Sequence, residues 1–138
     1  MVLNQECFRD IILYIQDHTE KEIINGKPRM HEVTYYEITN APNLACYTND
    51  DKHYIVTKLF EGGYVNGNYS PNLENFQRAR MSSLTLKGHE IADNISNDTI
   101  WNNVKDKFKG ATKISLSLLS QVVGETAAAY SKKMMGIE

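Results

Sequence analysis

The chain has 138 residues, of which 41% are hydrophobic and 23% are charged, and this composition is typical of a folded globular domain. The net charge of −2 argues against indiscriminate binding to polyanions, because neutralising phosphates requires clustered lysine and arginine. Residues 1–61 carry six basic and ten acidic side chains (−4), whereas residues 62–138 carry nine basic and seven acidic ones (+2). We therefore expect positive potential in the second half of the chain.

The cysteine content and the hydropathy pattern indicate the compartment. Cys7 and Cys46 are too few for a disulfide framework, and Cys7 lies in a helical pattern that predicts a buried, reduced thiol. No signal-peptide pattern opens the sequence, and no apolar run reaches about 18 residues. We therefore expect a cytoplasmic protein with no membrane partner.

The first predicted element is an amphipathic helix from Asn4 to His18. Its apolar face is formed by Cys7, Phe8, Ile11, Ile12 and Ile15. Residues 19–29 end in a turn pattern (Asn-Gly-Lys-Pro) and are predicted to form a loop. Residues 30–39 are rich in β-branched and aromatic side chains, which predicts a strand. At residues 40–49 we expect a short or distorted helix, or extended chain.

The stretch from Asp50 to Glu90 has the pattern of a helix, a glycine stop, a β-hairpin and a second helix. Thr48, Asn49 and Asp50 are the candidate N-caps of the first helix. Gly62-Gly63 ends this helix, because the left-handed residue after a helix is most often glycine. Strands are predicted at 64–65 and 81–84, with turn residues between them at Asn66, Gly67, Asn68, Ser70, Pro71 and Asn72. Thr85 is expected to cap a helix that continues through Ile95.

Two further helices are predicted in the C-terminal part. The first spans residues 98–109, begins at a cap formed by Asn97 or Asp98, and contains Trp101 in its apolar stripe. We interpret this tryptophan as a core residue, with an exposed partner anchor as the alternative. The second runs from a cap at Ser115 to about Met135 and has a broad apolar face. That face either covers the domain core or pairs with a second copy of the chain in a homodimer.

These elements together predict the α+β class and a winged helix-turn-helix-like architecture. The core would span residues 1–96, and the helices of residues 97–138 would pack on it as a C-terminal extension of one structural domain. In this arrangement the helix that ends at Gly62-Gly63 is the recognition helix, and the following hairpin is the wing.

The segment LTLKGHEIADNISNDTIWNNVKDKFK, followed by ISLSLLSQVV, resembles the bacterial and phage domain-of-unknown-function 2513 family. The matching residues are Leu84, Thr85, Gly88, His89, Glu90, Asp93, Trp101 and Lys105. The chain departs from the family pattern at Lys87, at Ile91 and in a long loop at 66–78, which affects the expected shape of the hairpin. The resemblance implies a winged-helix-like fold and a phage or prophage origin. It implies no known activity, so no catalytic residue is transferred.

The central helix and the hairpin supply the candidate nucleic-acid contacts. If Ile55, Val56, Leu59 and Phe60 face the core, the opposite side of the helix is available to double-stranded DNA. The candidate nucleic-acid-binding residues are His53, Tyr54, Thr57, Lys58, Arg78, Arg80 and Lys87. We expect a DNA-binding, regulator-like protein. The alternative is an adaptor that binds a bacterial or phage protein through the same scaffold, because Asp51 and Glu61 would repel phosphate.

The sequence predicts no catalytic, cofactor or metal site. His18, His31, His53 and His89 do not have the spacing of zinc ligands, and His89 is interpreted as a structural hydrogen-bonding residue. Neither a phosphate-binding loop nor a dinucleotide-binding glycine pattern follows a predicted strand. We therefore expect a protein without enzymatic activity.

Overall fold

The computed structural model describes residues 3–19, 21–70, 76–111 and 113–136. The helices are α1 (Gln5–His18), α2 (Tyr35–Asn40), α3 (Asn49–Glu61), α4 (Leu86–Ser96), α5 (Asp98–Lys107) and α6 (Leu116–Met134), with short 3-10 helices η1 (Pro42–Leu44) and η2 (Phe76–Arg78). The strands are β1 (Lys21–Ile24), β2 (Lys27–Met30), β3 (Val33–Thr34), β4 (Val65–Asn68) and β5 (Arg80–Leu84). The chain therefore belongs to the α+β class, as predicted.

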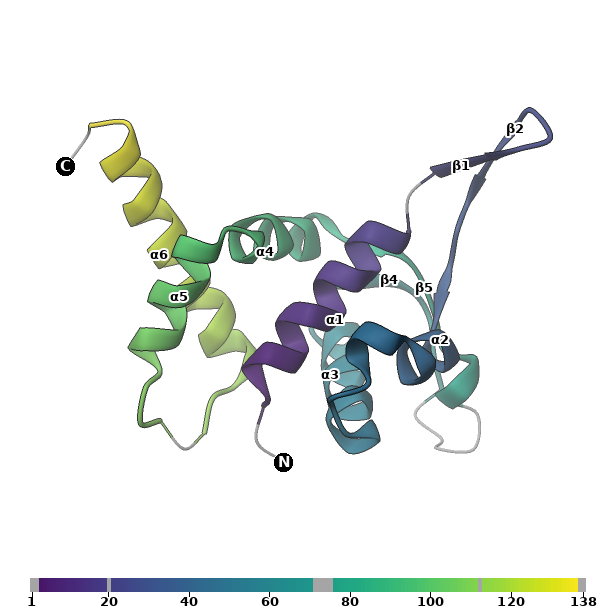
Figure 1. The fold of residues 1–138 in the computed structure, drawn as a ribbon, viewed down its shortest axis with the longest axis horizontal. Coiled ribbons are helices and arrows are strands. Elements are labelled where there is room, and N and C mark those ends of the chain that lie inside the picture. The colour runs from purple at the N-terminus through teal and green to yellow at the C-terminus, as the bar shows by residue number, and fades with distance from the viewer. Residues whose placement is uncertain (1–2, 20, 71–75, 112, 137–138) are drawn as a thin grey trace.

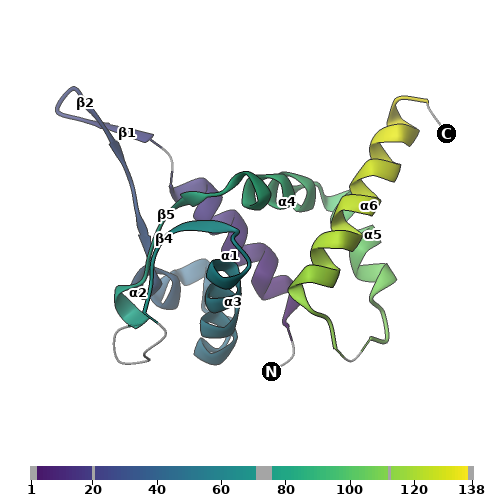
Figure 2. The same ribbon diagram turned by 180° about the vertical axis from the view of Figure 1, so that it is seen from behind.

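The body of the molecule is a small antiparallel sheet packed against helices (Figure 1). The sheet has three strands in the order β3–β5–β4, so the strand that comes last in the sequence lies in the middle. Helix α1 contacts α3, α4 and β5, and it lies at the centre of the molecule. The β1–β2 hairpin and the end of α6 project from opposite ends of this body (Figure 2).

Helix α3 begins and ends where local chemistry predicts. The Thr48 hydroxyl accepts a hydrogen bond from the Asp51 amide at 3.1 Å, which identifies the N-cap among the three candidates. At the other end Gly63 has a φ of 74°, and the Tyr64 amide donates to the Leu59 carbonyl at 2.9 Å. This left-handed turn satisfies the last carbonyls and directs the chain into β4.

Two predictions in the N-terminal region are wrong. Residues 21–30 form the strands β1 and β2 where a loop was predicted, although the predicted turn is present at Asn25 and Gly26 between them. Of the strand predicted at 30–39, only Met30 at the end of β2 and the two-residue strand β3 are extended, and α2 begins at Tyr35. The Thr34 hydroxyl accepts from the Glu37 amide and caps α2, and the buried Tyr35 and Ile38 are spaced as on a helix. Burial at this spacing outweighed the β propensity of the side chains.

The region before α3 is short and irregular, as expected. Helix η1 occupies Pro42–Leu44, and Leu44 is fully buried. Lys52 on α3 is also buried, with 2% of its surface exposed, and its ammonium group donates to the Thr39 carbonyl at 3.4 Å. A cation at the carbonyl end of a helix is favourable, so Lys52 joins α3 to the end of α2.

Two glycines allow close backbone approaches around the sheet. A Cβ on Gly88 would lie 2.1 Å from the Tyr64 carbonyl oxygen, so α4 packs on the start of β4 only with glycine there. Gly67, expected in the turn, instead lies inside β4 at a register shift, and a Cβ there would lie 1.8 Å from the Arg80 carbonyl oxygen. Both glycines are required by tertiary contacts.

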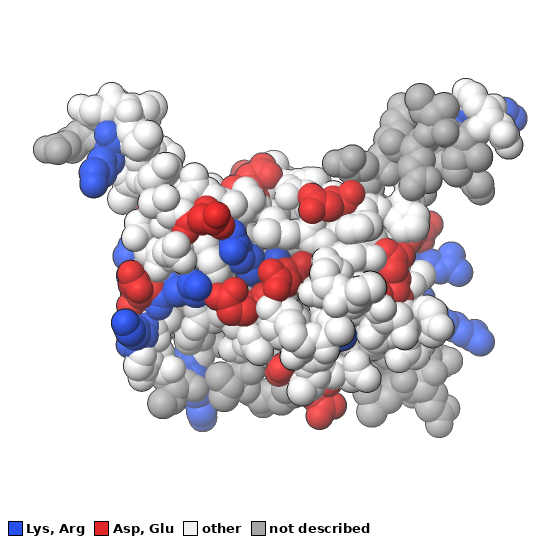
Figure 3. Space-filling model, viewed as in Figure 1, with Lys and Arg blue, Asp and Glu red and all other residues white. Residues whose placement is uncertain are grey.

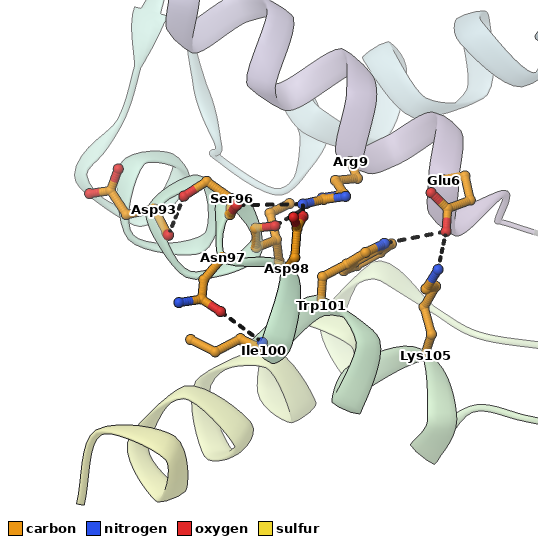
Figure 4. A network of polar contacts seen from close by, with 10 residues as sticks. Glu6, Arg9, Asp93, Ser96, Asn97, Asp98, Ile100, Trp101 and Lys105 are labelled. Atoms are coloured by element: carbon orange, nitrogen blue, oxygen red, sulfur yellow. Dashed lines mark hydrogen bonds and ion pairs between the residues drawn. The ribbon is translucent and has the colours of Figure 1, made fainter. Parts of the chain in front are cut away.

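The α4–α5 junction is held by side chains of α1 (Figure 4). Arg9 donates to the Ile95 carbonyl at 2.9 Å and forms an ion pair with Asp98 at 2.8 Å. Glu6 accepts from the indole nitrogen of Trp101 at 3.3 Å and pairs with Lys105 at 2.9 Å. Trp101 is 1% exposed, so it is a core residue and the alternative of an exposed anchor is wrong.

Residues from all six helices and from the three-stranded sheet contribute to one hydrophobic cluster. From α6 the cluster includes Leu119, Val123 and Ala127. Cys7 is a fully buried free thiol, as predicted, and burial raises its pKa to about 12. In the described ranges of the chain, no helix is both long and apolar enough to cross a membrane.

Candidate nucleic-acid interface

The inner face of α3 is close to the predicted one. Ile55, Val56 and Leu59 are fully buried, whereas Phe60 is only half-buried and turns toward the β4–β5 hairpin. There its ring stacks on Tyr69 with 4.4 Å between ring centroids. The fully buried face of the helix is therefore narrower at this end than the sequence predicts.

His53 and Thr57 do not point outward, which corrects the prediction for these two residues. The ring of His53 lies 4.1 Å from that of Phe76 and 6.1 Å from that of Tyr35, in a cluster with η2. The Nε2 atom of His53 and the hydroxyl of Thr57 are both buried, with no hydrogen-bond partner among the described residues. The physical reason for His53 is that Phe76 of η2 packs on it, and because both polar atoms are buried, neither is available to a ligand in this structure.

Tyr54 and Lys58 remain on the accessible side of α3. The Lys58 ammonium group forms an ion pair with Glu61 at 3.1 Å and lies 5.6 Å from the centre of the Tyr54 ring. The side chain of Lys58 is 40% exposed, so this pair is weak and can be exchanged for another anion. Asp50 and Asp51 in the first turn add negative charge to the same helix.

Lys87 is held by the backbone at the end of α3. Its ammonium group donates to the Gly62 carbonyl at 3.0 Å and lies 4.4 Å above the ring of Tyr64. The neighbouring Thr85 hydroxyl donates to the Gly63 carbonyl at 2.7 Å. Both hydrogen bonds satisfy backbone carbonyls at the end of α3 that have no partner within the helix. Lys87 therefore has a structural role in addition to its exposed charge.

Arg78 and Arg80 are exposed on either side of the buried Ala79. Arg78 ends η2, and Arg80 begins β5, opposite Asn68 on one side and Thr34 on the other. In the part of the chain that the structure describes, neither guanidinium forms an ion pair. Within the described ranges, these two arginines thus have neither the ion pair of Lys58 nor the carbonyl contact of Lys87.

A hollow that the sequence did not predict joins three of the candidates to the C-terminal helix. It has a volume of about 280 Å³ and is lined on its α3–α4 side by Tyr54, Lys58 and Lys87. On the other side it is lined by residues 115–117, the start of α6. No local pattern could have shown this, because α6 lies more than fifty residues after α3 in the sequence.

A second, smaller hollow lies at the β4–β5 hairpin. We call it the hairpin hollow; it is lined by Asn68, Tyr69, Ser70, Arg78 and Ala79. It therefore places Arg78 beside an aromatic ring that the sequence analysis did not select. In the sequence, this site could have been suggested only by the presence of Tyr69 and Arg78 on either side of a polar loop.

The charges on the opposite face of the molecule are mixed. Acidic side chains spread across the middle of the α1 face, with basic ones interspersed and at the margins (Figure 3).

Among the described residues, no group of three or more His, Cys, Asp or Glu side chains is placed to hold a metal ion. His31 instead contacts Glu37 at 3.2 Å, and Glu37 also accepts from the Tyr14 hydroxyl at 2.5 Å. That hydrogen bond, together with burial as the larger cause, raises the pKa of Tyr14.

One comparison with known proteins identifies a family. The model of a family described as "Hypothetical protein (DUF2513)" matches residues 2–114, so the match ends just before α6. No curated protein matches the chain, and no solved structure does.

Proposed function

The chain belongs to the DUF2513 family, and from the order of its elements we propose that it is a winged-helix protein that binds double-stranded DNA without catalysing a reaction. The order that supports this is α1, β3, α2, α3, β4, β5, with the β1–β2 hairpin inserted after α1. With the sheet order β3–β5–β4, α3 takes the place of a recognition helix and the β4–β5 hairpin that of a wing. A cytoplasmic regulator of phage or prophage type fits this proposal.

The observation that carries the proposal is that Arg78 and Arg80, beside the β4–β5 hairpin, form no ion pair among the described residues. Arg78 and Arg80 are exposed on the segment that follows the candidate recognition helix. Guanidinium groups bind phosphates with two parallel hydrogen bonds, so these residues would hold the DNA backbone while α3 enters the major groove. On α3, Tyr54 and Lys58 would then be the side chains closest to the bases.

Titration of a labelled DNA duplex at two salt concentrations tests this proposal. We expect binding that weakens steeply with salt, because each phosphate contact releases condensed counterions. Arg78→Ala and Arg80→Ala should each lower the salt slope by about 1. Lys132→Ala, which removes an exposed charge from the far end of α6, is the matched control and should leave affinity unchanged. No binding at low salt would contradict DNA binding.

A protein-binding adaptor is the second candidate function, and the acidic side chains of α3 favour it. Asp50, Asp51 and Glu61 outnumber Lys58 on the accessible part of the helix, and Lys58 is already paired. Such a surface suits a bacterial or phage protein with a basic patch better than it suits phosphate. The same titration distinguishes the adaptor from a DNA-binding protein. The adaptor is favoured if the native chain shows no duplex binding and the double variant Asp50→Asn, Asp51→Asn does bind the duplex.

A homodimer through α6 is the third part of the proposal. Met134 and Met135 at the end of this helix are 69% and 66% exposed, and Ala128 and Ala129 are exposed before them. Small residues and methionines are adaptable contact surfaces. Sedimentation equilibrium over a range of protein concentrations would detect the dimer, and a monomer at all concentrations would contradict it.

A further inference from the structure

The hairpin hollow is sized for one ring and not for a large ligand. Its volume is about 180 Å³. Pockets for drug-sized molecules are larger, about 300–1,000 Å³. Buried Ala79 contributes to its wall, and Asn68, Tyr69 and Arg78 supply an amide, an aromatic ring and a cation.

The Tyr69 ring is held in place by contacts with two other aromatic rings. It stacks on Phe60 of α3 with 4.4 Å between centroids and 19° between planes. It also meets the ring of Phe76 in η2 edge-on, at 6.2 Å and 84°. Phe76 is 2% exposed and is itself packed against Tyr35 and His53. A ring held in this way loses little conformational entropy when a ligand stacks on it.

The polar groups of the hollow match the remaining parts of a nucleotide. Arg78 is exposed and has no ion-pair partner in the described ranges, so its guanidinium is available to a phosphate. The Asn68 side chain is also exposed, and its amide can both donate to and accept from a base edge. A cation, an amide and an aromatic ring around one ring-sized space are the elements by which proteins hold single-stranded nucleotides.

We propose that the hairpin hollow binds one unpaired nucleotide of DNA, with its base against Tyr69 and its phosphate on Arg78. Paired bases are stacked inside the duplex and cannot reach such a ring without being extruded. The protein should consequently prefer a duplex that contains an unpaired nucleotide. This inference rests on the proposed DNA binding and adds to it the structure of the DNA that is preferred.

Two labelled duplexes that differ by one extra, unpaired adenine test the inference. At the same salt concentration, the native protein should bind the bulged duplex about tenfold more tightly, as expected for one base stacked on an aromatic side chain. Tyr69→Phe keeps the ring and should keep the preference. Tyr69→Leu removes the ring and should bind both duplexes equally, with the affinity for the perfect duplex unchanged.

A fluorescent base in the bulge reports stacking directly. With 2-aminopurine as the unpaired base, native protein and Tyr69→Phe should quench its fluorescence on binding, and Tyr69→Leu should not. Asn68→Ala leaves the aromatic cluster intact, so it tests the base-edge contact even if Tyr69→Leu fails to fold. The native protein should bind a bulge that contains adenine more tightly than a bulge that contains an abasic site. We expect Asn68→Ala to reduce this difference.

The outcomes separate this inference from the proposed function. Equal affinity of the native protein for both duplexes, or unchanged 2-aminopurine fluorescence on binding, would overturn the nucleotide site and leave duplex binding intact. Failure to bind either duplex at low salt would overturn both proposals. Retention of the preference by Tyr69→Leu, with a native melting temperature, would show that Tyr69 only supports the hairpin.

Discussion

At the α4–α5 junction Asp98, Trp101 and Lys105 are all held by side chains of α1, whereas at the β4–β5 hairpin Arg78 and Arg80 have no ion-pair partner among the described residues. The first region lies within the part of the chain that the family model matches. The side chains of this region stabilise the fold, since each contact joins two elements that are far apart in the sequence. The cations of the second region are the ones that we propose to contact DNA. The comparison shows that charged side chains of one surface can be used to join elements, while those of another have no ion-pair partner in the described ranges.

The largest expected effect is at the junction. Trp101→Ala removes the most voluminous fully buried side chain and leaves Glu6 without its indole donor. We expect a loss of about 3–5 kcal/mol in the free energy of unfolding, measured by urea denaturation. Trp101→Phe, which keeps most of the volume, should lose much less. Equal losses in the two variants would contradict the role that we assign to packing.

Gly88→Ala should have the next largest effect. The new Cβ would lie 2.1 Å from the Tyr64 carbonyl oxygen, so α4 must move away from β4, at a cost of about 1–3 kcal/mol. Gly124→Ala in α6 is the matched control, because a Cβ there meets nothing within 4 Å. Alanine is the better helix former by about 1 kcal/mol, so the control should be more stable than the native chain. Thermal unfolding should therefore show a lower melting temperature than native for Gly88→Ala and a higher one for Gly124→Ala.

Thr85→Ala should cost about 1 kcal/mol as the loss of an N-cap, because the hydroxyl accepts from the Gly88 amide. The same hydroxyl donates to the Gly63 carbonyl at the end of α3. Thr85→Ser keeps both hydrogen bonds and should be close to native in urea denaturation. If alanine and serine are equally stable, the link between α3 and α4 is not made by this hydroxyl.

The smallest effect on stability is expected at the hairpin. Arg80→Ala should change the free energy of unfolding by less than about 0.5 kcal/mol, because the side chain is exposed and forms no ion pair among the described residues. The same variant should lose affinity for duplex DNA. A large loss of stability in Arg80→Ala would remove the contrast between the two regions.

Local chemistry was sufficient to predict where most helices begin. Thr48, Thr85, Asn97 and Ser115 cap α3, α4, α5 and α6, each by accepting from the amide three residues later. Such a contact depends on neighbouring residues alone, so the sequence shows it directly. The fold class followed from these helices and from the β5 strand.

Tertiary contacts decided the parts that the sequence analysis missed. His53 and Thr57 lie on a helix that was correctly predicted, but Phe76 of η2 packs on His53 and the Thr57 hydroxyl is buried. Residues 35–40 have strand-like composition yet form α2, because Tyr35 and Ile38 are buried at helical spacing. The hairpin hollow brings Tyr69 and Arg78 together from opposite ends of a loop.

The sequence by itself thus determined the class of the fold, most of the capped helix starts and the core position of Trp101. Only the tertiary structure decided which polar side chains of α3 are covered and which charges remain uncompensated. The physical reason is range: caps and helical periodicity are set by residues within one or two turns, whereas burial and charge pairing depend on elements brought together from distant parts of the chain.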